Sequence, residues 1–269
     1  EMGGKHRGSY EERESARNRM SRLRDRATQL EIQINADLFD NAHVIASTLV
    51  SSNHRILNGR HFGTLFIDEA AQALEAACWI AIRKADRVVL AGDHCQLPPT
   101  IKCYEAARGG LDQTLMEKVV TNKPVSVSLL KVQYRMNEAI MRFPSEWFYN
   151  NQLESAPEVR HRGILDYDTP MVWIDTSELE FHEEFVGESF GRINKPEADL
   201  LIQELKNYIQ RIGENRVFDE RIDFGLISPY KAQVQYLRNK IKSSSFFRPF
   251  RELITINTVD GFQGQERDV

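Results

Sequence analysis

The amino-acid sequence predicts an α/β fold with mainly parallel sheets, and two observations support this. Short apolar runs rich in β-branched residues alternate with longer amphipathic or Ala-rich stretches over most of the 269 residues, which is the pattern of strands joined by crossover helices. Several of these apolar runs end abruptly in carboxylates, hydroxyls or glycine. Ligands of open α/β sheets bind beyond the carboxyl ends of the strands, so these strand ends are the candidate functional positions.

The composition is that of a globular chain long enough for two domains of ordinary size. Hydrophobic residues make up 41% of the sequence and charged residues 28%. The sequence has no run of about 18 apolar residues that could span a membrane, and its polar N-terminus has no signal-peptide core. A net charge of −4 provides no bulk attraction for nucleic acid, so any such binding would use a local groove.

The three cysteines, Cys78, Cys95 and Cys103, fit no metal-binding spacing. His94 lies next to Cys95, but no second pair of this kind supports a metal site there. An odd number of such cysteines is typical of a reduced, intracellular protein, either cytoplasmic or nuclear.

Changes in composition divide the sequence into three parts. Residues 1–42 are highly charged and arginine-rich, residues 43–124 form a first domain, and residues 125–269 form a second, with the linker at 121–124. Charged and apolar residues at helical spacing predict a long helix from about 10 to 37 in the first part. This helix is either a solvated helix with i,i+4 charge pairs or an arm or stalk that faces nucleic acid.

The first domain is expected to begin with a buried strand, His43–Leu49, that ends in Ser47 and Thr48. Hydroxyl groups at the carboxyl end of a strand can bond a phosphate, but they can equally cap the next helix, which is expected at 53–58. Both interpretations remain open at this point.

The apolar run Thr64–Ile67 predicts a strand that is buried on both faces. It ends in Asp68 and Glu69, and an Ala-rich helix is expected at 74–82. A strand-end Asp can hold Mg²⁺ through water, because this small hard cation prefers oxygen ligands. The adjacent Glu is then placed to orient and deprotonate an attacking water. The alternative is an ordinary strand end.

A third buried strand is expected at Arg87–Ala91, followed by the loop Gly92–Thr100. Glycine permits a tight turn and the double proline stiffens the loop. Gln96 lies on this loop beside the carboxylate strand, where its amide could sense a terminal phosphate. The alternative is a rigid surface turn. A helix is expected at 109–120.

The second domain shows the same alternation of strands and helices. It opens with an apolar run at 125–132, followed by an amphipathic segment at 138–148. Strands are expected at 171–174, 224–227 and 254–259, helices at 196–212 and 231–241, and irregular segments at 150–170 and 177–194. No internal sequence repeat accompanies the similar architecture of the two halves.

Taken together, five motifs resemble those of the superfamily 1B helicases, the Upf-like group with AAA-type helicase domains, in the order that this family has them. The motifs are Asp68-Glu69-Ala70-Ala71-Gln72, Gly92-Asp93 through Gln96-Leu97-Pro98-Pro99-Thr100, Gln133-Tyr134-Arg135-Met136, Ser228-Pro229-Tyr230-Lys231-Ala232-Gln233 and Thr258-Val259-Asp260-Gly261-Phe262-Gln263-Gly264-Gln265-Glu266. Each motif alone is weak or moderate evidence, whereas the ordered set is specific and covers most of residues 43–269.

This resemblance implies two RecA-like domains of the P-loop NTPase type, the first incomplete, that clamp ATP and draw a single strand of RNA or DNA across their tops. It implies that Asp68 holds Mg²⁺, Glu69 is the water-activating base and Gln96 contacts the γ-phosphate. Tyr134 would pack on the base or sugar with its flat apolar face, and Arg135 would act as an arginine finger. The resemblance also implies that Glu266 bonds the ribose. Six further residues would track the nucleic-acid backbone: Ser47, Thr48, Pro99, Thr100, Ser228 and Thr258.

The sequence departs from the family at both ends. It contains no Gly-x-x-x-x-Gly-Lys-Ser/Thr loop, since Gly3-Gly4-Lys5-His6 lacks the preceding strand, the first glycine and the hydroxyl. The last arginine motif of the family is also absent. We therefore expect a piece of a longer ATP-dependent helicase, moving 5′ to 3′, that does not hydrolyse ATP by itself. The alternative is a non-catalytic module, with a degenerate helicase fold, that binds nucleic acid or a partner protein.

Overall fold

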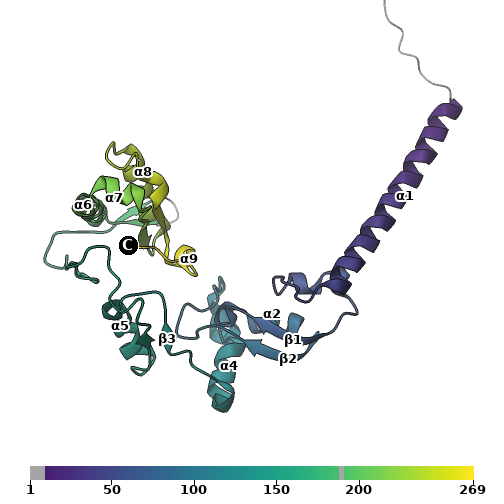
Figure 1. Ribbon diagram of the computed structural model, residues 1–269, viewed down its shortest axis with the longest axis horizontal. Coiled ribbons are helices and arrows are strands. Elements are labelled where there is room, and N and C mark those ends of the chain that lie inside the picture. The colour runs from purple at the N-terminus through teal and green to yellow at the C-terminus, as the bar shows by residue number, and fades with distance from the viewer. Residues whose placement is uncertain (1–9, 188–190) are drawn as a thin grey trace, which may run out of the picture. The chain divides into compact units, whose positions relative to one another are not determined.

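The computed structural model describes residues 10–187 and 191–269, which form a mixed α/β structure (Figure 1). The chain divides into two compact units, Glu1–Val127 and Ser128–Val269, close to the boundary predicted at residues 124 and 125. The start of the predicted segment 1–42, including its Gly-Lys pair, lies outside the described residues.

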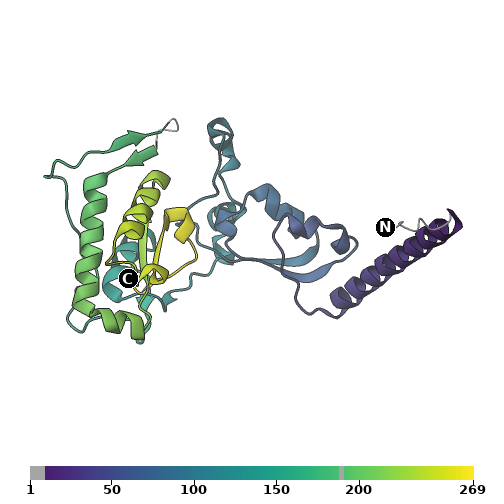
Figure 2. The ribbon, with the colours of Figure 1, turned by 90° about the horizontal axis from the view of Figure 1, so that it is seen from above.

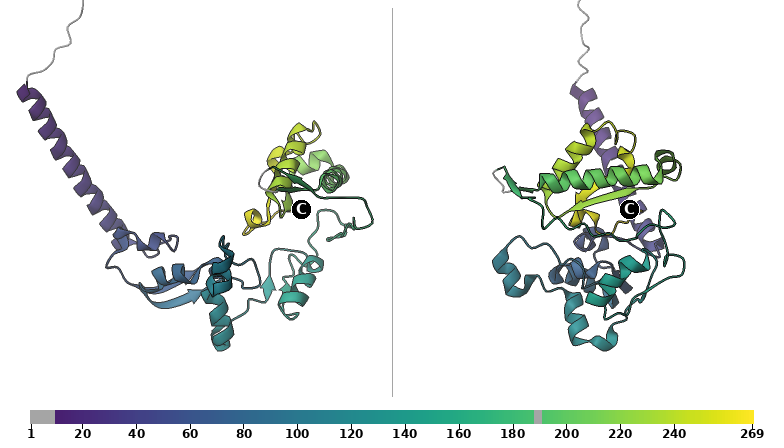
Figure 3. Two further views of the ribbon diagram at one scale, coloured as in Figure 1. Left: turned by 180° about the vertical axis from the view of Figure 1, so that it is seen from behind. Right: turned by 90° about the vertical axis from the view of Figure 1, so that its left-hand side faces the viewer.

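The first unit is built around two strands that run side by side (Figure 3). Its elements are α1 (Tyr10–Asn41), η1 (Ser51–Asn53), η2 (Arg55–Leu57), β1 (Phe62–Ile67), η3 (Ala70–Gln72), α2 (Glu75–Ile82), β2 (Ala85–Leu90), α3 (Tyr104–Ala106), η4 (Ala107–Leu111), α4 (Leu115–Asn122) and η5 (Pro124–Ser126). β1 and β2 are parallel, with Phe62 opposite Ala85 and Ile67 opposite Leu90. Both strands therefore end at the same edge of the sheet.

A small core secures this sheet. Ile67, Ala70 and Cys78 are buried together, and partly buried side chains of α4, including Leu115 and Met116, pack against them. The prediction that β1 is buried on both faces is wrong, because Phe66 is 71% exposed. The strand predicted to be buried at Arg87–Ala91 is wrong in the same respect, because β2 has no buried residue and Val89 is 39% exposed. Only one face of this two-stranded sheet carries a core among the described residues.

The predicted strand at 43–49 is also wrong. Residues 44–48 have no regular structure, and Val44 is 85% exposed. An apolar run becomes a strand only where another strand edge pairs with it, and β1 and β2 pair only with each other in the described chain. The helix predicted at 109–120 is broken instead at Gly110, whose φ of 93° is not helical. α4 begins after that break, with Thr114 and Glu117 as a capping box.

α1 is one continuous helix of 32 residues, which confirms the long helix predicted from about 10 to 37. Residues 13–34 are exposed throughout. Near its end the helix is held by Arg60, whose Nη1 lies 2.7 Å from Asp40 Oδ1 and whose guanidinium lies 5.6 Å from the centre of the Phe39 ring.

The described part of the second unit contains three two-stranded sheets and three longer helices, and its elements begin at residue 132. They are β3 (Val132–Gln133), α5 (Glu138–Phe148), β4 (Glu154–Ser155), β5 (Glu184–Val186), β6 (Gly191–Ile193), α6 (Lys195–Ile212), α7 (Glu214–Asp219), β7 (Phe224–Ser228), α8 (Lys231–Ser243), η6 (Arg251–Leu253), β8 (Ile254–Thr258) and α9 (Val259–Phe262). The pairs β3–β4 and β7–β8 are parallel, and β5–β6 is an antiparallel hairpin.

The main core of the second unit lies between β7–β8 and the helices. α6 and α8 lie side by side (Figure 2), and both bury apolar side chains against Phe224 and Leu226 of β7 and against the Phe247 and Phe250 rings. α6 begins where the sequence predicts, because Asn194 caps it and Pro196 stands in its first turn.

Two sequence predictions in this unit are wrong. The strand predicted at 171–174 is irregular, and Trp173 is 85% exposed. The segment predicted to be irregular at 177–194 contains the β5–β6 hairpin, whose strands are only three residues long. No helix within residues 10–187 and 191–269 has the length and apolarity needed to cross a membrane.

Candidate nucleotide and nucleic-acid sites

The loops that follow β1 and β2 are joined by backbone hydrogen bonds. The Ala91 N–H donates to the Ile67 carbonyl at 2.8 Å, and the Ala70 N–H donates to the Ala91 carbonyl at 2.8 Å. A Cβ at Gly92 would lie 2.9 Å from the Ala70 nitrogen, so only glycine allows this approach. The loop that carries Asp68 and Glu69 therefore lies directly beside the loop that carries Gln96.

Asp68 and Glu69 stand at the carboxyl end of β1 with exposed side chains. Glu69 has a left-handed backbone, with φ 51° and ψ 40°, which is uncommon for a residue other than glycine and clusters at functional sites. Two hydrogen bonds hold this turn: the Glu69 N–H donates to Asp68 Oδ1 at 3.0 Å, and Gln72 Nε2 donates to Glu69 Oε2 at 2.8 Å. The catalytic carboxylate predicted from the sequence is therefore oriented by Gln72.

Gln96 is held in place by Asp93. Asp93 Oδ2 accepts from Gln96 Nε2 at 2.8 Å, and its Oδ1 accepts from the Cys95 N–H at 3.0 Å. Asp93 takes one N–H of the Gln96 amide, so the second N–H and the amide oxygen are left to face a ligand. A phosphate oxygen could accept from this N–H, and a water could bond either atom.

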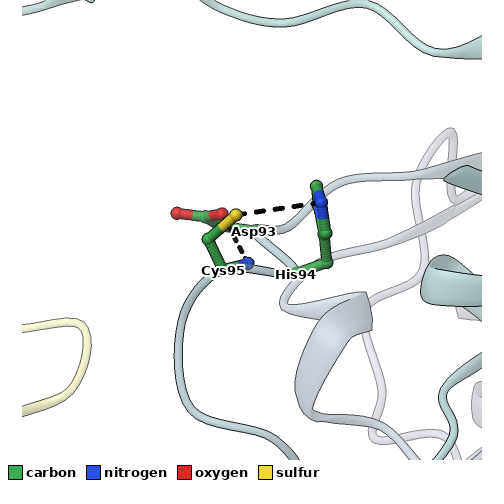
Figure 4. Close-up of side chains that lie close together, drawn as sticks. All are labelled: Asp93, His94 and Cys95. Carbon is green, nitrogen blue, oxygen red and sulfur yellow. Dashed lines mark hydrogen bonds between the residues drawn. The ribbon is translucent and has the colours of Figure 1, made fainter. Parts of the chain in front are cut away.

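Asp93, His94 and Cys95 bring three potential metal-ligand atoms within 4.8 Å of one another (Figure 4). The chemistry of the three groups does not favour a metal. Burial, and next the Asp93 carboxylate, raise the pKa of the Cys95 thiol, whereas metals bind the thiolate. Cys95 Sγ lies 3.8 Å from His94 Nε2, and Asp93 already holds Gln96. The three groups stabilise the loop.

The residues present fit a magnesium ion but only part of a nucleotide site. Asp68 offers a hard, exposed carboxylate at a strand end, and Mg²⁺ typically takes one or two such ligands together with waters and substrate phosphates. A cradle of backbone N–H groups for those phosphates needs a glycine-rich loop, and the sequence contains no Gly-x-x-x-x-Gly-Lys-Ser/Thr.

In the second unit, Gln133 builds the turn that presents Tyr134 and Arg135. Its Oε1 accepts from the N–H groups of Arg135 and Met136, both at 2.9 Å, and its Nε2 donates to the Met136 carbonyl and to Ser155 Oγ, both at 2.7 Å. One half-buried amide thus makes four hydrogen bonds. Tyr134 is consequently 69% exposed on a rigid turn.

Arg135 and Glu266, predicted to act on the same nucleotide, pair with each other. Arg135 Nε lies 3.1 Å from Glu266 Oε2. The segment that carries Glu266 runs along β7, where the Gly225 N–H donates to the Val269 carbonyl at 2.8 Å and the Val269 N–H donates to the Asp223 carbonyl at 3.1 Å. This backbone pairing holds Glu266 at a defined place.

Ser228 and Thr258 are opposite each other at the carboxyl ends of β7 and β8, as expected of residues from two neighbouring strand ends. Their hydroxyls serve local turns. Ser228 is 7% exposed and its Oγ accepts from the Tyr230 N–H at 3.4 Å, while Thr258 Oγ1 accepts from the Gly261 N–H at 3.3 Å and caps α9.

Ser47 and Thr48 do not lie at a strand end, which corrects the expectation for them. Thr48 Oγ1 accepts from the Ser51 N–H at 3.2 Å, so this hydroxyl bonds the first residue of η1, although Val50 is the N-cap residue. Pro99 and Thr100 lie on the loop after Gln96, where Pro99 is half-buried and Thr100 exposed.

Three positioning residues were not assigned a role from the sequence: Gln72, Asp93 and Gln133. All three lie within the five helicase-like motifs, and this position is the sequence signal that could have identified them as functional. Their roles require the three-dimensional hydrogen bonds, because each acts through a neighbour within three residues.

Comparison with known proteins finds two matching family models, each described as an AAA domain, one over residues 111–269 and the other over residues 1–103. An uncharacterized ATP-dependent helicase of Methanocaldococcus jannaschii is 32% identical over 93% of this chain and 37% of its own length. The DNA polymerase alpha-associated DNA helicase A of Saccharomyces cerevisiae is 33% identical over 97% of this chain and 41% of its own length. A regulator of nonsense transcripts 1 homolog of Arabidopsis thaliana is 34% identical over 90% of this chain and 19% of its own length.

The chain thus spans about two fifths or less of the length of these curated relatives. The matches extend over both units and include every motif described above. The chain belongs to the superfamily 1B, Upf-like helicases with AAA-type domains.

Proposed function

We propose that this chain carries the ATP-hydrolysing and strand-tracking residues of a helicase that moves along single-stranded RNA or DNA and unwinds duplexes in the 5′ to 3′ direction. The observation that carries the proposal is the joined pair of loops at the carboxyl edge of β1 and β2. There, the loop that carries Asp68 and Glu69 is hydrogen-bonded at Ala70 to the start of the loop that carries the Asp93–Gln96 pair. An ordinary strand end has no need for a strained, oriented carboxylate beside an oriented amide.

Each side chain has a role that suits its atoms. Asp68 holds Mg²⁺, which supplies charge neutralisation on the phosphates when bound. Glu69, held by Gln72, accepts a proton from the attacking water. Gln96 contacts the γ-phosphate with its amide group, and Arg135 stabilises charge on the transferring phosphoryl group. Tyr134 packs on the base or sugar, and Glu266 bonds the ribose.

Strand tracking is assigned to the loops at the strand ends. Pro99 and Thr100 lie on the loop after Gln96, and Ser228 and Thr258 lie at the ends of β7 and β8. Ser47 and Thr48 remain weaker candidates, because their hydroxyls are engaged locally. Contacts of this kind to sugar and phosphate carry no base code, so they suit RNA and DNA equally. A reduced intracellular compartment is proposed from the free cysteines.

A second candidate is a non-catalytic module that binds nucleic acid or a partner. The missing phosphate loop favours it. The hydrogen bonds that orient Glu69 and Gln96 argue against it, because a chain relieved of catalysis has no physical need for them.

The test is phosphate release and duplex unwinding by the protein expressed from its complete coding sequence, with Mg²⁺, ATP and single-stranded RNA or DNA. Glu69→Gln should abolish both activities and keep nucleotide binding. Glu105→Gln is the matched control, because it makes the same change at an exposed position of the same unit and should leave both activities intact. The 269-residue chain alone should release phosphate only at background. Unchanged activity in Glu69→Gln would refute the proposal.

A further inference from the structure

α1 carries a continuous apolar stripe that no part of the described chain covers. The stripe consists of Ala16, Met20, Leu23, Ala27, Leu30 and Ile34, at alternating spacings of four and three residues. Its larger members are exposed: Met20 by 51%, Leu23 by 63%, Leu30 by 42% and Ile34 by 57%. This alternation is the seam of a coiled coil, in which apolar residues recur every 3.5 residues on average.

The residues that flank the stripe divide the helix into a basic and an acidic half. Four arginines border its N-terminal half: Arg17, Arg19, Arg24 and Arg26. Beside its C-terminal half stand Glu31 and Asp40, and α1 has no lysine or arginine after Arg26. Flanking charges of this kind determine the partner and the orientation of a coiled coil. Two such helices in antiparallel orientation place the basic half of each beside the acidic half of the other.

We propose that α1 pairs with α1 of a second copy of this chain in an antiparallel, two-fold symmetric dimer. In the register with matching charges, Leu23 lies opposite the partner's Ile34 and Ala27 opposite the partner's Leu30. The apolar pairing ends there, because Met20 lies opposite the partner's Asp37. Arg24 then faces the partner's Glu31, and Arg19 lies beside the partner's Asp40, which also binds Arg60 within its own chain. By symmetry every pair occurs twice.

Other pairings of the same helix bring like charges together. A parallel dimer places Asp37 against the partner's Asp37 inside the seam, and Arg19 against the partner's Arg24. The antiparallel register shifted by one heptad places Arg24 against the partner's Arg24. Like charges in such positions destabilise the pair, so the charge pattern selects the register proposed above.

A nucleic-acid strand along α1 is a poorer occupant. Phosphates would meet arginines in the first half but Glu31, Asp37 and Asp40 in the second, and the exposed apolar stripe would gain no partner. A second copy covers Leu23, Ala27, Leu30 and Ile34 of the stripe and places Arg24 against Glu31.

The test is the oligomeric state of the 269-residue chain by sedimentation equilibrium at low salt. The chain should dimerise. Arg24→Glu or Glu31→Arg alone should weaken dimerisation by about tenfold or more, because each turns two attractive pairs into two repulsive ones. The double variant with both changes should restore the affinity, since it exchanges the charges and recreates both pairs.

Two matched controls lie on the outer face of α1. Arg22→Glu makes the same charge change away from the seam, and Ile32→Ala removes an apolar side chain that is 65% exposed on that face; neither should alter dimerisation. Leu23→Ala should weaken it while circular dichroism remains unchanged. A monomeric chain, or a dimer that is insensitive to Arg24→Glu and Glu31→Arg, would overturn the proposal. A monomeric parent chain that binds an oligonucleotide, and loses this binding in Arg24→Glu, would assign the helix to nucleic acid instead.

Discussion

Arg135 Nε lies 3.1 Å from Glu266 Oε2, although the two residues are 131 positions apart in the sequence. Their side chains are 57% and 66% exposed, respectively. An exposed pair of this kind contributes only about 0–1 kcal/mol. The contact therefore keeps the guanidinium near Glu266 without preventing its transfer to a phosphate.

Arg135→Ala should reduce the rate of phosphate release by the complete protein about 10³-fold or more, as expected of an arginine finger. Glu266→Gln should have a much smaller effect on this rate and should mainly raise KM for ATP, because ribose contacts act on binding. Arg248→Ala, at an exposed position of the same unit, is the control. If Arg135→Ala changed the rate only a few-fold, the assignment of the arginine finger would be wrong.

Asp93 should act on the reaction mainly through Gln96, although its Oδ1 also accepts from the Cys95 N–H. Asp93→Ala frees the Gln96 amide, whose Nε2 is now held at 2.8 Å, and should lower kcat with little change in KM. The double variant with Gln96→Ala should be no slower than Gln96→Ala alone, since residues in one hydrogen-bonded network are not additive. Fully additive effects in this cycle would show that Asp93 acts independently.

The elements whose positions were predicted closely carry two signals in their own sequence: a strand or helix periodicity, and residues that mark where the element begins or ends. β1, β2, β7 and β8 are short apolar runs that stop at glycine, hydroxyl or carboxylate residues, and α6 has its cap Asn194 and Pro196 in sequence. The runs at 43–49 and 171–174 look equally apolar but remain irregular, with Val44 and Trp173 each 85% exposed. Apolar content does not specify a pairing partner, and that partner is a non-local property of the fold.

In the candidate site, too, local sequence signals identify some features, whereas others depend on non-local contacts. Strand-end chemistry and motif order pointed to Asp68, Glu69 and Gln96 from the sequence alone. The hydrogen bonds of Gln72 and Asp93 that orient them depend on side-chain rotamers and on the approach of one loop to the other at Gly92. The Arg135–Glu266 pair depends on the C-terminal segment following β7. No local pattern contains that information.

Gln133→Ala should lower the free energy of unfolding of the 269-residue chain by about 1–3 kcal/mol, because the backbone N–H groups of Arg135 and Met136 lose their acceptor. The midpoint of urea denaturation measures this change. Gln152→Ala, at an exposed position, should have no measurable effect. Equal midpoints for the two variants would show that the turn before Arg135 does not depend on Gln133.

Asp68→Asn should raise the Mg²⁺ concentration that gives half-maximal phosphate release by the complete protein by about 10–100-fold, since an amide is a weaker ligand for this cation. The readout is a Mg²⁺ titration at saturating ATP. Asp112→Asn makes the same change at an exposed position of the same unit and should leave the titration unchanged. A normal Mg²⁺ requirement in Asp68→Asn would exclude Asp68 as the metal ligand.

Tyr208 and Asp168 should make the stability of the second unit depend on pH at both extremes. Burial, and then the hydrogen bond to Asp168, raise the pKa of Tyr208 to about 12. The pKa of Asp168 is lowered, first by that hydrogen bond and then by Arg211, whose Nη2 lies 2.5 Å from Asp168 Oδ1. The folded state thus favours the neutral phenol and the charged carboxylate.

The sign of each effect follows from this preference. The contribution of Tyr208 is complete below its unfolded pKa of about 10 and is lost as pH rises through about 12. The contribution of Asp168 is complete above its unfolded pKa and is lost as pH falls through the lowered value. Tyr208→Phe should therefore destabilise the chain by a constant amount near neutral pH, and this difference should shrink toward both extremes. Tyr167→Phe, which alters a fully exposed ring, should give a curve parallel to that of the parent chain. A Tyr208→Phe difference that stayed constant above pH about 10 would show that the folded state does not bind the phenol proton more tightly.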